Sequence, residues 1–416
     1  MLKDDEKMLP GGGCMDKSIK IILITSANFP RGSAAANFLN LFCKGVAFSG
    51  GQIEVFLLKG YFLAGKKTND SRSNLTDYGV KYTYLGRINR SSYKIIKILS
   101  DIKAFFSLFY LLLSDCRNRK RTTIFTYNNE IQNSFLINIY CRITGTKLIT
   151  FVPEFYDISE FAGGLLTKMR WYGFLLTFNY LNRLSDKLIV FSSYIRDRYL
   201  EKGFPKEMIM VQPNLTDFDF WQNESEKVEF TLGYCGTPYK KDGLEDLLNA
   251  VSIQNNKGCK INLLIIGDVV NEKSIIPVLQ EYCEKLGILE CVTFTGLIPV
   301  EEVKDWLGKC KVLVITRPLT VQTMAGFPTK IGEYFACCKI VLSTKIGDIG
   351  IYFNDKEEIV FAEPGNPDSI SKGIDWILEN PVMCSKIALN GYEKAKTLLD
   401  YKVKVAEILS FAGCDK

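Results

Sequence analysis

The residues with the clearest potential for chemistry lie between Thr316 and Thr344. Two apolar runs, Val312–Ile315 and Ile340–Ser343, predict buried strands at the two ends of this stretch. Between them the sequence predicts a turn at residues 325–328 and a helix from near Thr329, because proline fits the first turn of a helix. Such a strand, loop and helix N-terminus can hold a phosphate group, since free N–H groups and the helix dipole point at the loop.

Three charged side chains of this stretch suit a phosphorylated ligand. Arg317 and Lys330 can add charge-assisted hydrogen bonds to the phosphate oxygens. Glu333 lies one turn into the helix, on the side that faces back to the loop. Its carboxylate can accept hydrogen bonds from the hydroxyls of a sugar there.

Other loops that follow predicted strands in the second half of the chain are Gly236–Gly243, Gly267-Asp268 and Thr295–Pro299. In an open α/β sheet, ligands bind outside the carboxyl ends of the strands. Lys241, Arg317 and Lys330 can therefore converge on one site. Together with Glu333 and glycine-rich backbone, that site suits a diphosphate with a ribose attached. Taken singly, a loop lysine is usually a solvated charge and a glycine after a strand is usually a turn, so the hypothesis rests on their joint occurrence.

Alternating strand and helix patterns must position these loops. The apolar run Ile19–Thr25, the helical spacing of Ala34–Ser49 and the strand Ile53–Leu58 form a β-loop-α-β opening. The alternation continues to Val211 and starts again at Phe230. Near-continuous apolar strands in this order indicate an α/β protein with two Rossmann-like, doubly wound parallel sheets, and 416 residues fit two domains.

The predicted division of the chain follows the composition. Residues 1–14 are expected to be disordered or a mis-assigned start before Met15, since they are polar and carry no apolar core of a signal peptide. We expect an N-terminal domain at 15–214, a linker at 215–228, a C-terminal domain at 229–383 and a C-terminal helix at 384–416 that can cross back to the first domain. No stretch reaches about 18 uncharged apolar residues, so no transmembrane helix is predicted.

Composition excludes several kinds of chemistry. The chain contains no histidine, which removes Ser-His-Asp triads, histidine metal sites and imidazole general bases. Its 13 cysteines include no CxxC pair, which favours free thiols in a reducing cytoplasm over a zinc site. The net charge of +6 fits an anionic ligand or a membrane surface and is too diffuse for a protein that binds nucleic acid.

A family resemblance lies in three segments of the chain, SANFPRGSAAANFL, GTPYKKDGLEDLLNAV and PTKIGEYFACCKIVLST. They resemble the retaining glycosyltransferases of family four, in particular those of bacterial surface-polysaccharide synthesis. The resemblance covers the chain from Met15 onward, and Phe327–Ser343 is its specific part. It implies the type B fold, in which two Rossmann-like domains face each other across a cleft.

The resemblance also implies a function. The C-terminal domain would bind a nucleotide-diphosphate-sugar, and the N-terminal domain would bind a glycan or lipid-linked acceptor. The enzyme would be a hexosyl- or N-acetylhexosaminyl-transferase of capsule or lipopolysaccharide synthesis. Its expected location is the cytoplasm, where it could bind at the inner face of the membrane. No cofactor, no metal and no nucleic acid would be needed, because basic residues can neutralise the donor diphosphate.

Family residues can be matched position by position. Glu333 matches the glutamate that holds the ribose hydroxyls, and Lys241 matches the basic residue that contacts the diphosphate. The other donor-binding positions that we expect are Gly32, Ser33, Gly236, Gly267, Leu297, Ile298, Arg317, Gly326, Phe327, Pro328, Thr329 and Lys330. Among these, Leu297 and Ile298 would lie beside the base, and Gly32 and Ser33 would close over the phosphates.

Some positions depart from the family pattern. Ala325 replaces a second glutamate and Thr237 replaces an arginine, so Arg317 is expected to supply the missing positive charge. Catalysis would be a front-face substitution in which Lys241, Arg317 and Lys330 stabilise the departing diphosphate. Glu154, which follows the predicted strand Leu148–Val152, is the best carboxylate to orient the acceptor; alternatively it is a surface loop acid.

Two predicted helices of the first domain bear on the acceptor. The segments FFSLFYLLL, preceded by Lys94, Lys97 and Lys103, and KMRWY, at 168–172, mix basic, aromatic and apolar residues. Such helices can lie in a membrane interface, so peripheral membrane contact is expected; alternatively they are ordinary core-facing helices.

Two other functions are alternatives to a glycosyltransferase. A nucleotide-sugar epimerase has the same fold, but its chemistry needs ionisable groups that a histidine-free chain lacks. A catalytically silent subunit that binds nucleotide-sugars is the other alternative, and Ala325 and Thr237 are the residues that favour it.

Overall fold

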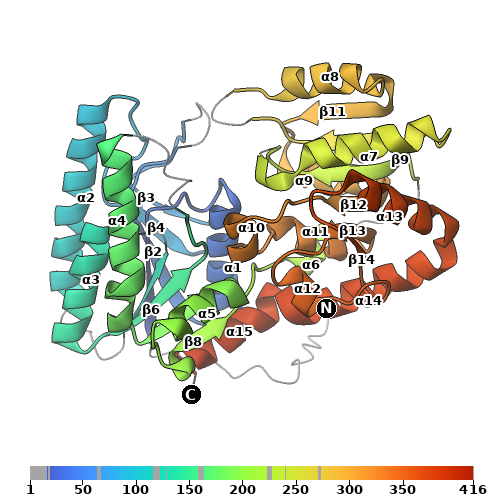
Figure 1. Ribbon diagram of the computed structural model, residues 1–416. Helices are drawn as coiled ribbons and strands as arrows, with labels where there is room; N and C mark the ends of the chain where they lie inside the picture. The colour runs from blue at the N-terminus through green and yellow to red at the C-terminus, as the bar shows by residue number, and fades with distance from the viewer. Residues whose placement is uncertain are drawn as a thin grey trace, which may run out of the picture.

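Two parallel sheets, each covered by helices on both faces, make up the protein in the computed structural model (Figure 1). The structure describes residues 16, 19–62, 67–115, 122–127, 129–157, 164–222, 227–238, 240–269 and 273–415. The expected start at 1–14 and Met15 lie outside these residues. Two doubly wound α/β domains confirm the predicted fold class.

The N-terminal sheet has eight strands in the order β3-β4-β2-β1-β5-β6-β7-β8, and all neighbours are parallel except β3 and β4. Its strands are β1 (Lys20–Thr25), β2 (Gln52–Leu57), β3 (Ser73–Leu75), β4 (Lys81–Tyr84), β5 (Thr122–Tyr127), β6 (Lys147–Val152), β7 (Lys187–Val190) and β8 (Ile209–Val211). The strand order reverses on the two sides of β1, as in other doubly wound sheets.

Alternate residues of β1 enter two different cores. Ile21 and Leu23 pack with α1 (Ala34–Phe48), whereas Ile22 and Ile24 pack with the helices of the opposite face. Those helices are α2 (Lys94–Asp115) and α3 (Ile131–Thr144). In α4 (Leu165–Asn179), Phe178 instead belongs to a core with Leu188 and Val190 of β7, and α5 (Ser193–Glu201) follows β7. Burial of both strand faces explains why β1 reads as one continuous apolar run.

The C-terminal sheet has six parallel strands in the order β11-β10-β9-β12-β13-β14. They are β9 (Phe230–Cys235), β10 (Leu263–Ile266), β11 (Val292–Gly296), β12 (Cys310–Ile315), β13 (Ile340–Thr344) and β14 (Val360–Ala362). The helices around them are α6 (Phe218–Trp221), α7 (Leu244–Asn256), α8 (Ile276–Lys285), α9 (Val300–Gly308), α10 (Val321–Ala325), α11 (Thr329–Ala336), α12 (Ile349–Tyr352), α13 (Pro367–Glu379) and α14 (Pro381–Leu399).

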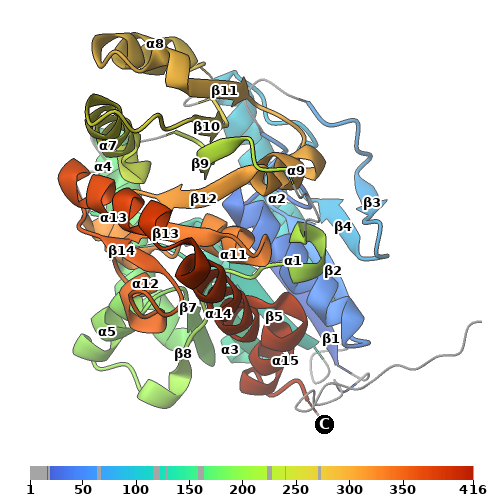
Figure 2. The same ribbon diagram turned by 90° about the vertical axis from the view of Figure 1, so that its right-hand side faces the viewer.

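The C-terminal segment differs from the single helix predicted at 384–416. The structure has two helices, α14 and α15 (Tyr401–Phe411), because Asp400 adopts an extended conformation and its carboxylate accepts a hydrogen bond from the backbone N–H of Lys402. Such a capping aspartate begins a new helix. α15 packs on α1, and Val405 and Ile408 belong to the core of the first domain (Figure 2).

The chain crosses between the domains twice, and the two crossings are hydrogen-bonded to each other. The N–H of Thr216 donates to the carbonyl of Leu399 at 2.8 Å, and the N–H of Tyr401 donates to the carbonyl of Thr216 at 3.1 Å. The first crossing lies within the linker predicted at 215–228, and the first part of that segment forms the short helix α6. Phe218 and Trp221 of α6 are buried in the C-terminal core. Burial of these two large apolar side chains fixes the segment on the second domain, although the residues around them in the sequence are polar.

Candidate functional site

The loops at the carboxyl ends of β9, β10 and β12 approach one another closely. Gly267 has φ +115°, and a Cβ atom there would lie 2.1 Å from the carbonyl oxygen of Gly236. Gly243 has φ +63°, and its Cβ atom would lie 1.9 Å from the carbonyl oxygen of Thr316. Only glycine combines this backbone conformation with so close an approach, so both glycines are required to bring the three loops together.

A buried carboxylate binds the two cations that follow β12 and begin α11. The Nζ atom of Lys330 lies 2.8 Å from Oδ1 of Asp242, and the Nε atom of Arg317 lies 3.3 Å from the same oxygen. Lys330 also donates to the hydroxyl of Tyr234 at 3.2 Å and lies 4.2 Å from the centre of its ring. Arg317 and Lys330 thus meet on one residue, Asp242, which sequence reasoning did not single out.

Electrostatics in this cluster favour an ionised carboxylate. Burial alone would raise the pKa of Asp242, but the charges of Lys330 and Arg317 outweigh it, and the pKa is lowered from its ordinary value. Burial lowers the pKa of the Lys330 ammonium, and Asp242 opposes that effect. With two cations on one carboxylate, the cluster carries an excess positive charge that suits an anionic ligand.

Glu333 lies one turn into α11 and has a different environment. It is half-buried, and its carboxylate has no hydrogen bond or ion pair with any residue that the structure describes. Burial raises the pKa of Glu333 to about 7, although the charge of Lys330 lowers it. The next residue, Tyr334, accepts a hydrogen bond from the N–H of Cys235 at 2.8 Å, which fixes α11 against β9. The backbone that carries Glu333 is therefore fixed, and the carboxylate oxygens have capacity to accept hydrogen bonds from ligand hydroxyls.

Lys241 and Gly236 lie next to this cluster. Lys241 is half-buried in the short helical turn Lys240–Asp242. Burial raises the pKa of Asp242, the charges of Lys330 and Arg317 lower it, and the charge of Lys241 adds a smaller lowering effect. A Cβ atom on Gly236 would lie 2.8 Å from Nζ of Lys330. Gly236 also has φ +147°, a conformation that other residues rarely adopt, so its backbone angle and the crowded ammonium both favour glycine at the end of β9.

The turn before α11 is held by residues of the first domain. Ser192 donates to the carbonyl of Ala325 at 2.7 Å, Asn214 donates to the carbonyl of Phe327, and the N–H of Ser193 donates to Asp348 at 2.7 Å. Phe327 and Pro328 are buried, whereas Gly326 and Thr329 are partly exposed at the turn and at the start of α11. These contacts hold the candidate phosphate-binding turn at the boundary between the domains.

The predicted turn at residues 325–328 begins one residue too early. Ala325 ends helix α10, which sequence reasoning missed and which Thr320 begins with a capping box that includes Thr323. The sequence contains a signal for this helix, because Thr320 and Thr323 have the spacing of a capping box and Met324 and Ala325 follow them. The side chain of Ala325 is buried among residues of the first domain, such as Val152 and Phe178.

Other predicted donor residues lie at the borders of this region. Leu297 is 60% exposed after β11, whereas Ile298 is partly buried against the C-terminal core, so the Leu297 side chain is the more accessible of the two. Gly32 and Ser33 are exposed at the start of α1 in the other domain. The structure gives these four residues no part in the Asp242 cluster.

Glu154 lies in a polar cavity of the first domain. The cavity has a volume of about 90 Å³, and its wall includes Thr126, Asn129, Asn138 and Thr150 as well as Glu154. The hydroxyl of Tyr156 donates to the Glu154 carboxylate. The side-chain oxygens of Asn129 and Asn138 are buried and have no hydrogen-bond partner among the described residues. Glu154 is therefore part of a cavity wall with unused acceptors.

An Asp-x-Asp sequence, Asp217-Phe218-Asp219, lies at the first crossing between the domains. Sequence reasoning did not identify it. Asp217 forms an ion pair with Lys44 of α1 at 2.6 Å, and Asp219 forms one with Lys402 of α15. These carboxylates therefore tie the crossing to α1 and α15. Within the described residues, no group of three Cys, Asp or Glu side chains is arranged to hold a metal ion.

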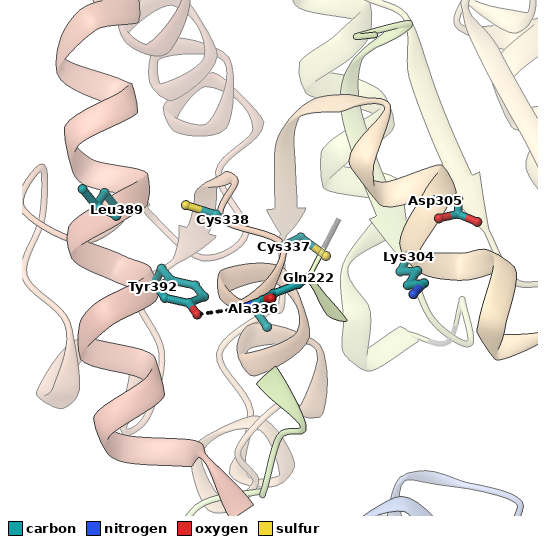
Figure 3. A pocket seen from close by; sticks show the side chains of 8 residues that line it. All are labelled: Gln222, Lys304, Asp305, Ala336, Cys337, Cys338, Leu389 and Tyr392. Carbon is teal, nitrogen blue, oxygen red and sulfur yellow. Dashed lines mark hydrogen bonds between the residues drawn. The ribbon is translucent and has the colours of Figure 1, made fainter. Parts of the chain in front are cut away.

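A larger open cavity of about 520 Å³ lies at the other end of α11 (Figure 3). Its lining residues are Gln222, Lys304, Asp305, Ala336, Cys337, Cys338, Leu389 and Tyr392. Gln222 donates to the hydroxyl of Tyr392 at 3.2 Å across one side of it. None of the predicted site residues lines this cavity, so size alone does not mark the candidate site.

The buried cluster generates a stability prediction. Replacement of Asp242 by Asn should lower the free energy of unfolding by about 3–5 kcal/mol, because it leaves Lys330 buried without its countercharge. Addition of Lys330→Met to that variant should recover a large part of the loss. Urea denaturation of the two single variants and the double variant measures this coupling. The control is Asp368→Asn, an exposed change on α13 that should leave the free energy of unfolding nearly unchanged. The prediction would be contradicted if Asp242→Asn lowered the free energy of unfolding equally with Lys330 present and with Lys330 replaced by Met.

The raised pKa of Glu333 generates a pH prediction. The pKa of Glu333 is higher in the folded protein than in the unfolded chain. The free energy of unfolding of the protein therefore falls as the pH rises from the unfolded pKa through about 7, because the buried carboxyl must then ionise. Relative to wild type, Glu333→Gln should therefore gain about 3 kcal/mol of unfolding free energy between roughly pH 4 and pH 8. Denaturation curves across this pH range test it, with Glu379→Gln on α13 as the control. Parallel curves for wild type and Glu333→Gln would refute it.

Comparisons with known proteins identify similar sequences and similar folds. Residues 216–394 match the family model described as glycosyl transferases group 1. An uncharacterized glycosyltransferase of Methanocaldococcus jannaschii is 24% identical over 345 residues, which cover 76% of this chain and 92% of the relative. The matched family region contains every residue of the Asp242 cluster and Glu333.

Solved structures show the same fold. Anabaena HepE in complex with UDP is 16% identical, with a TM-score of 0.70, over 94% of this chain and 100% of that chain. Sucrose-phosphate synthase from Thermosynechococcus elongatus is 16% identical, also with a TM-score of 0.70, over 94% of this chain and 97% of that chain. With a group 1 glycosyl transferase domain at 216–394 and the two-domain type B fold over nearly its whole length, the protein is a glycosyltransferase.

Proposed function

We propose that the protein is a retaining glycosyltransferase that moves a hexosyl or N-acetylhexosaminyl group from a nucleotide-diphosphate-sugar to a glycan or lipid-linked acceptor. The observation that carries this proposal is the cluster of Lys330, Arg317 and Asp242 beside Glu333, whose carboxylate has no partner among the residues that the structure describes. Cations and a free carboxylate at the carboxyl ends of parallel strands suit a diphosphate and the ribose next to it. The complexes of Anabaena HepE with UDP and with UDP-glucose support a donor of this class.

Each part of the donor has a matching group in the site. Lys241, Arg317 and Lys330 supply positive charge for the two phosphates, and the first turn of α11 adds free N–H groups. Glu333, ionised on ligand binding, accepts the ribose hydroxyls. The backbone near Leu297 and Ile298 lies beside the base. Gly32 and Ser33 approach the phosphates from the first domain. Basic residues neutralise the diphosphate in this proposal, so no metal ion takes part.

The proposed chemistry uses electrostatic stabilisation of the leaving group. As the bond between the sugar and the diphosphate breaks, negative charge grows on the leaving phosphate, and Lys241, Arg317 and Lys330 stabilise it. The acceptor hydroxyl attacks from the same face, and its proton passes to that phosphate. Glu154 orients the acceptor from its polar cavity in the first domain. Retention of the sugar configuration follows from attack on the face that the diphosphate leaves.

The biological setting of the proposal is bacterial surface-polysaccharide synthesis, such as that of capsule or lipopolysaccharide. Nucleotide-sugars are made in the cytoplasm, and a lipid-linked acceptor lies in a bilayer. This function would therefore place the protein in the cytoplasm, at the inner face of the cell membrane.

One observation favours a second candidate, a subunit that binds nucleotide-sugars without turnover. The position at which relatives often have a second glutamate is Ala325, whose side chain is buried in the first domain and cannot contact a donor. Thr237, at a position where relatives often have arginine, is exposed. Turnover of a bound donor separates the two candidates.

Nucleotide binding should depend on Glu333. Among UDP, GDP, ADP, CMP and dTDP, we expect one to bind in isothermal titration calorimetry, and Glu333→Ala should weaken it by about 1–3 kcal/mol because ribose hydroxyls lose their acceptor. Glu379→Ala on α13 is the matched control and should bind normally. A folded protein that binds none of the five nucleotides would refute the proposed donor site.

Transfer or slow hydrolysis of the matching nucleotide-sugar should give a product with the anomeric configuration of the donor. Proton NMR of the first product, before mutarotation, measures this configuration. EDTA should leave the rate unchanged, since basic residues neutralise the diphosphate. An inverted product, or a rate abolished by EDTA and restored by a divalent cation, would contradict the proposed mechanism. Tight donor binding with neither transfer nor hydrolysis would support the silent subunit.

A further inference from the structure

Helix α2 has two apolar stripes on opposite sides. Ala104, Leu108 and Leu112 recur at every fourth residue and are buried against the sheet. The outward side should then be polar, as on an ordinary surface helix. Instead it carries large apolar residues that are 46% to 74% exposed, namely Ile95, Ile98, Leu99, Ile102, Phe106, Phe109, Tyr110 and Leu113. Their spacing of one, three and four residues places them on one face, away from the sheet.

The two neighbouring helices continue this apolar surface. On α3, Phe135, Ile139 and Ile143 recur at every fourth residue and are exposed. On α4, exposed residues with helical spacing are Met169, Tyr172 and Leu176, followed by Tyr180. α3 contacts both α2 and α4, and the three helices lie together along one side of the first domain (Figure 1). We call the exposed apolar residues of these three helices the outer face.

Scattered exposed apolar residues are normal on soluble proteins, but a contiguous apolar surface marks an interaction site. The outer face extends across three helices and along about 30 Å of α2, at 1.5 Å per residue. Within the described residues, no helix is long and apolar enough to cross a membrane.

The charges around the outer face are mainly positive. The sequences of α2, α3 and α4 contain the basic residues Lys94, Lys97, Lys103, Arg142, Lys168 and Arg170, against the acidic residues Asp101 and Asp115. Asp101 is already bound to Arg90, at 3.0 and 3.2 Å. Exposed tyrosines at 93, 110, 172 and 180 add amphipathic rings of the kind enriched at the boundary between lipid and water.

We infer that the outer face docks on a bilayer that contains anionic lipids, with the apolar side chains among the acyl chains and the basic residues at the headgroups. A second copy of this chain fits less well, because a two-fold interface would set the same basic residues against each other. A bilayer of negative surface charge matches both the apolar area and the sign of the charge.

This inference deepens the proposed function, on which it rests for the nature of the acceptor. The cavity of Glu154 lies between the sheet and two helices of the outer face, since Ser134 and Asn138 of α3 and Phe174 and Thr177 of α4 line it. A bilayer docked on these helices would bring the headgroup of a lipid-linked acceptor to the same end of the first domain.

Vesicle flotation of the full chain tests the inference. The protein should float with phosphatidylcholine vesicles that contain phosphatidylglycerol and much less with pure phosphatidylcholine. Replacement of Leu99, Phe106 and Tyr110 together by glutamine should lower partition by about tenfold or more, since each residue loses apolar area among the lipids. The matched control replaces Val278, Ile351 and Val382, which are exposed apolar residues of the second domain, by glutamine. It should float like wild type.

Three results would overturn the inference. The first is a wild-type protein that stays in the soluble fraction, and the second is a variant at residues 99, 106 and 110 that floats unchanged. A third would be a wild-type dimer in analytical ultracentrifugation that the same variant converts to monomers, which would assign the outer face to a second copy. Nucleotide binding by calorimetry, measured on each variant, checks folding. It also separates the two proposals, because loss of vesicle binding leaves the donor site intact and absence of nucleotide binding leaves flotation intact.

Discussion

The carboxylate of Asp242 is the group on which the arrangement of the candidate site depends. One oxygen binds Lys330 of α11 and Arg317 after β12, so a single side chain connects the ends of three structural elements. The residue is 3% exposed, and two buried cations without it would repel each other at short range. Glycines at 236, 243 and 267 allow the loops to come close enough for this contact. The ion pairs of the site thus depend on the close approach of the loop backbones, which the glycines permit.

The relation between the domains depends on contacts far from that carboxylate. Residues 216 and 400, on the two crossing segments, are hydrogen-bonded neighbours, and α15 completes the core of the first domain. Asp217 and Asp219 hold the crossing to α1 and α15. Ser192 and Asn214 then bind carbonyls of the turn before α11. The first domain therefore helps to position a turn of the candidate site, and Ala325 at that turn is buried against the first domain.

Polarity divides the molecule into regions with different partners. Charged groups gather at the carboxyl ends of the second sheet, where a small anion can reach them. Apolar groups cover the outward side of α2, α3 and α4, where only an extended partner can cover them. The cavity of Glu154 lies next to the second of these regions, since residues of α3 and α4 line it. A donor in one domain and an acceptor held at a membrane by the other are consistent with this distribution.

By itself, the sequence determined the two α/β domains, because the strands are buried on both faces and read as continuous apolar runs between helical patterns. It also determined that Lys330, Arg317 and Glu333 lie near one another, since they follow or flank strands whose carboxyl ends share one edge. Tertiary structure alone decided that Asp242 binds both cations, that Asp400 divides the last helix, and that the second apolar stripe of α2 faces outward. The physical reason is that local pattern reports which residues avoid water. It does not report which distant side chain neutralises a buried charge or which apolar face finds no partner within the fold.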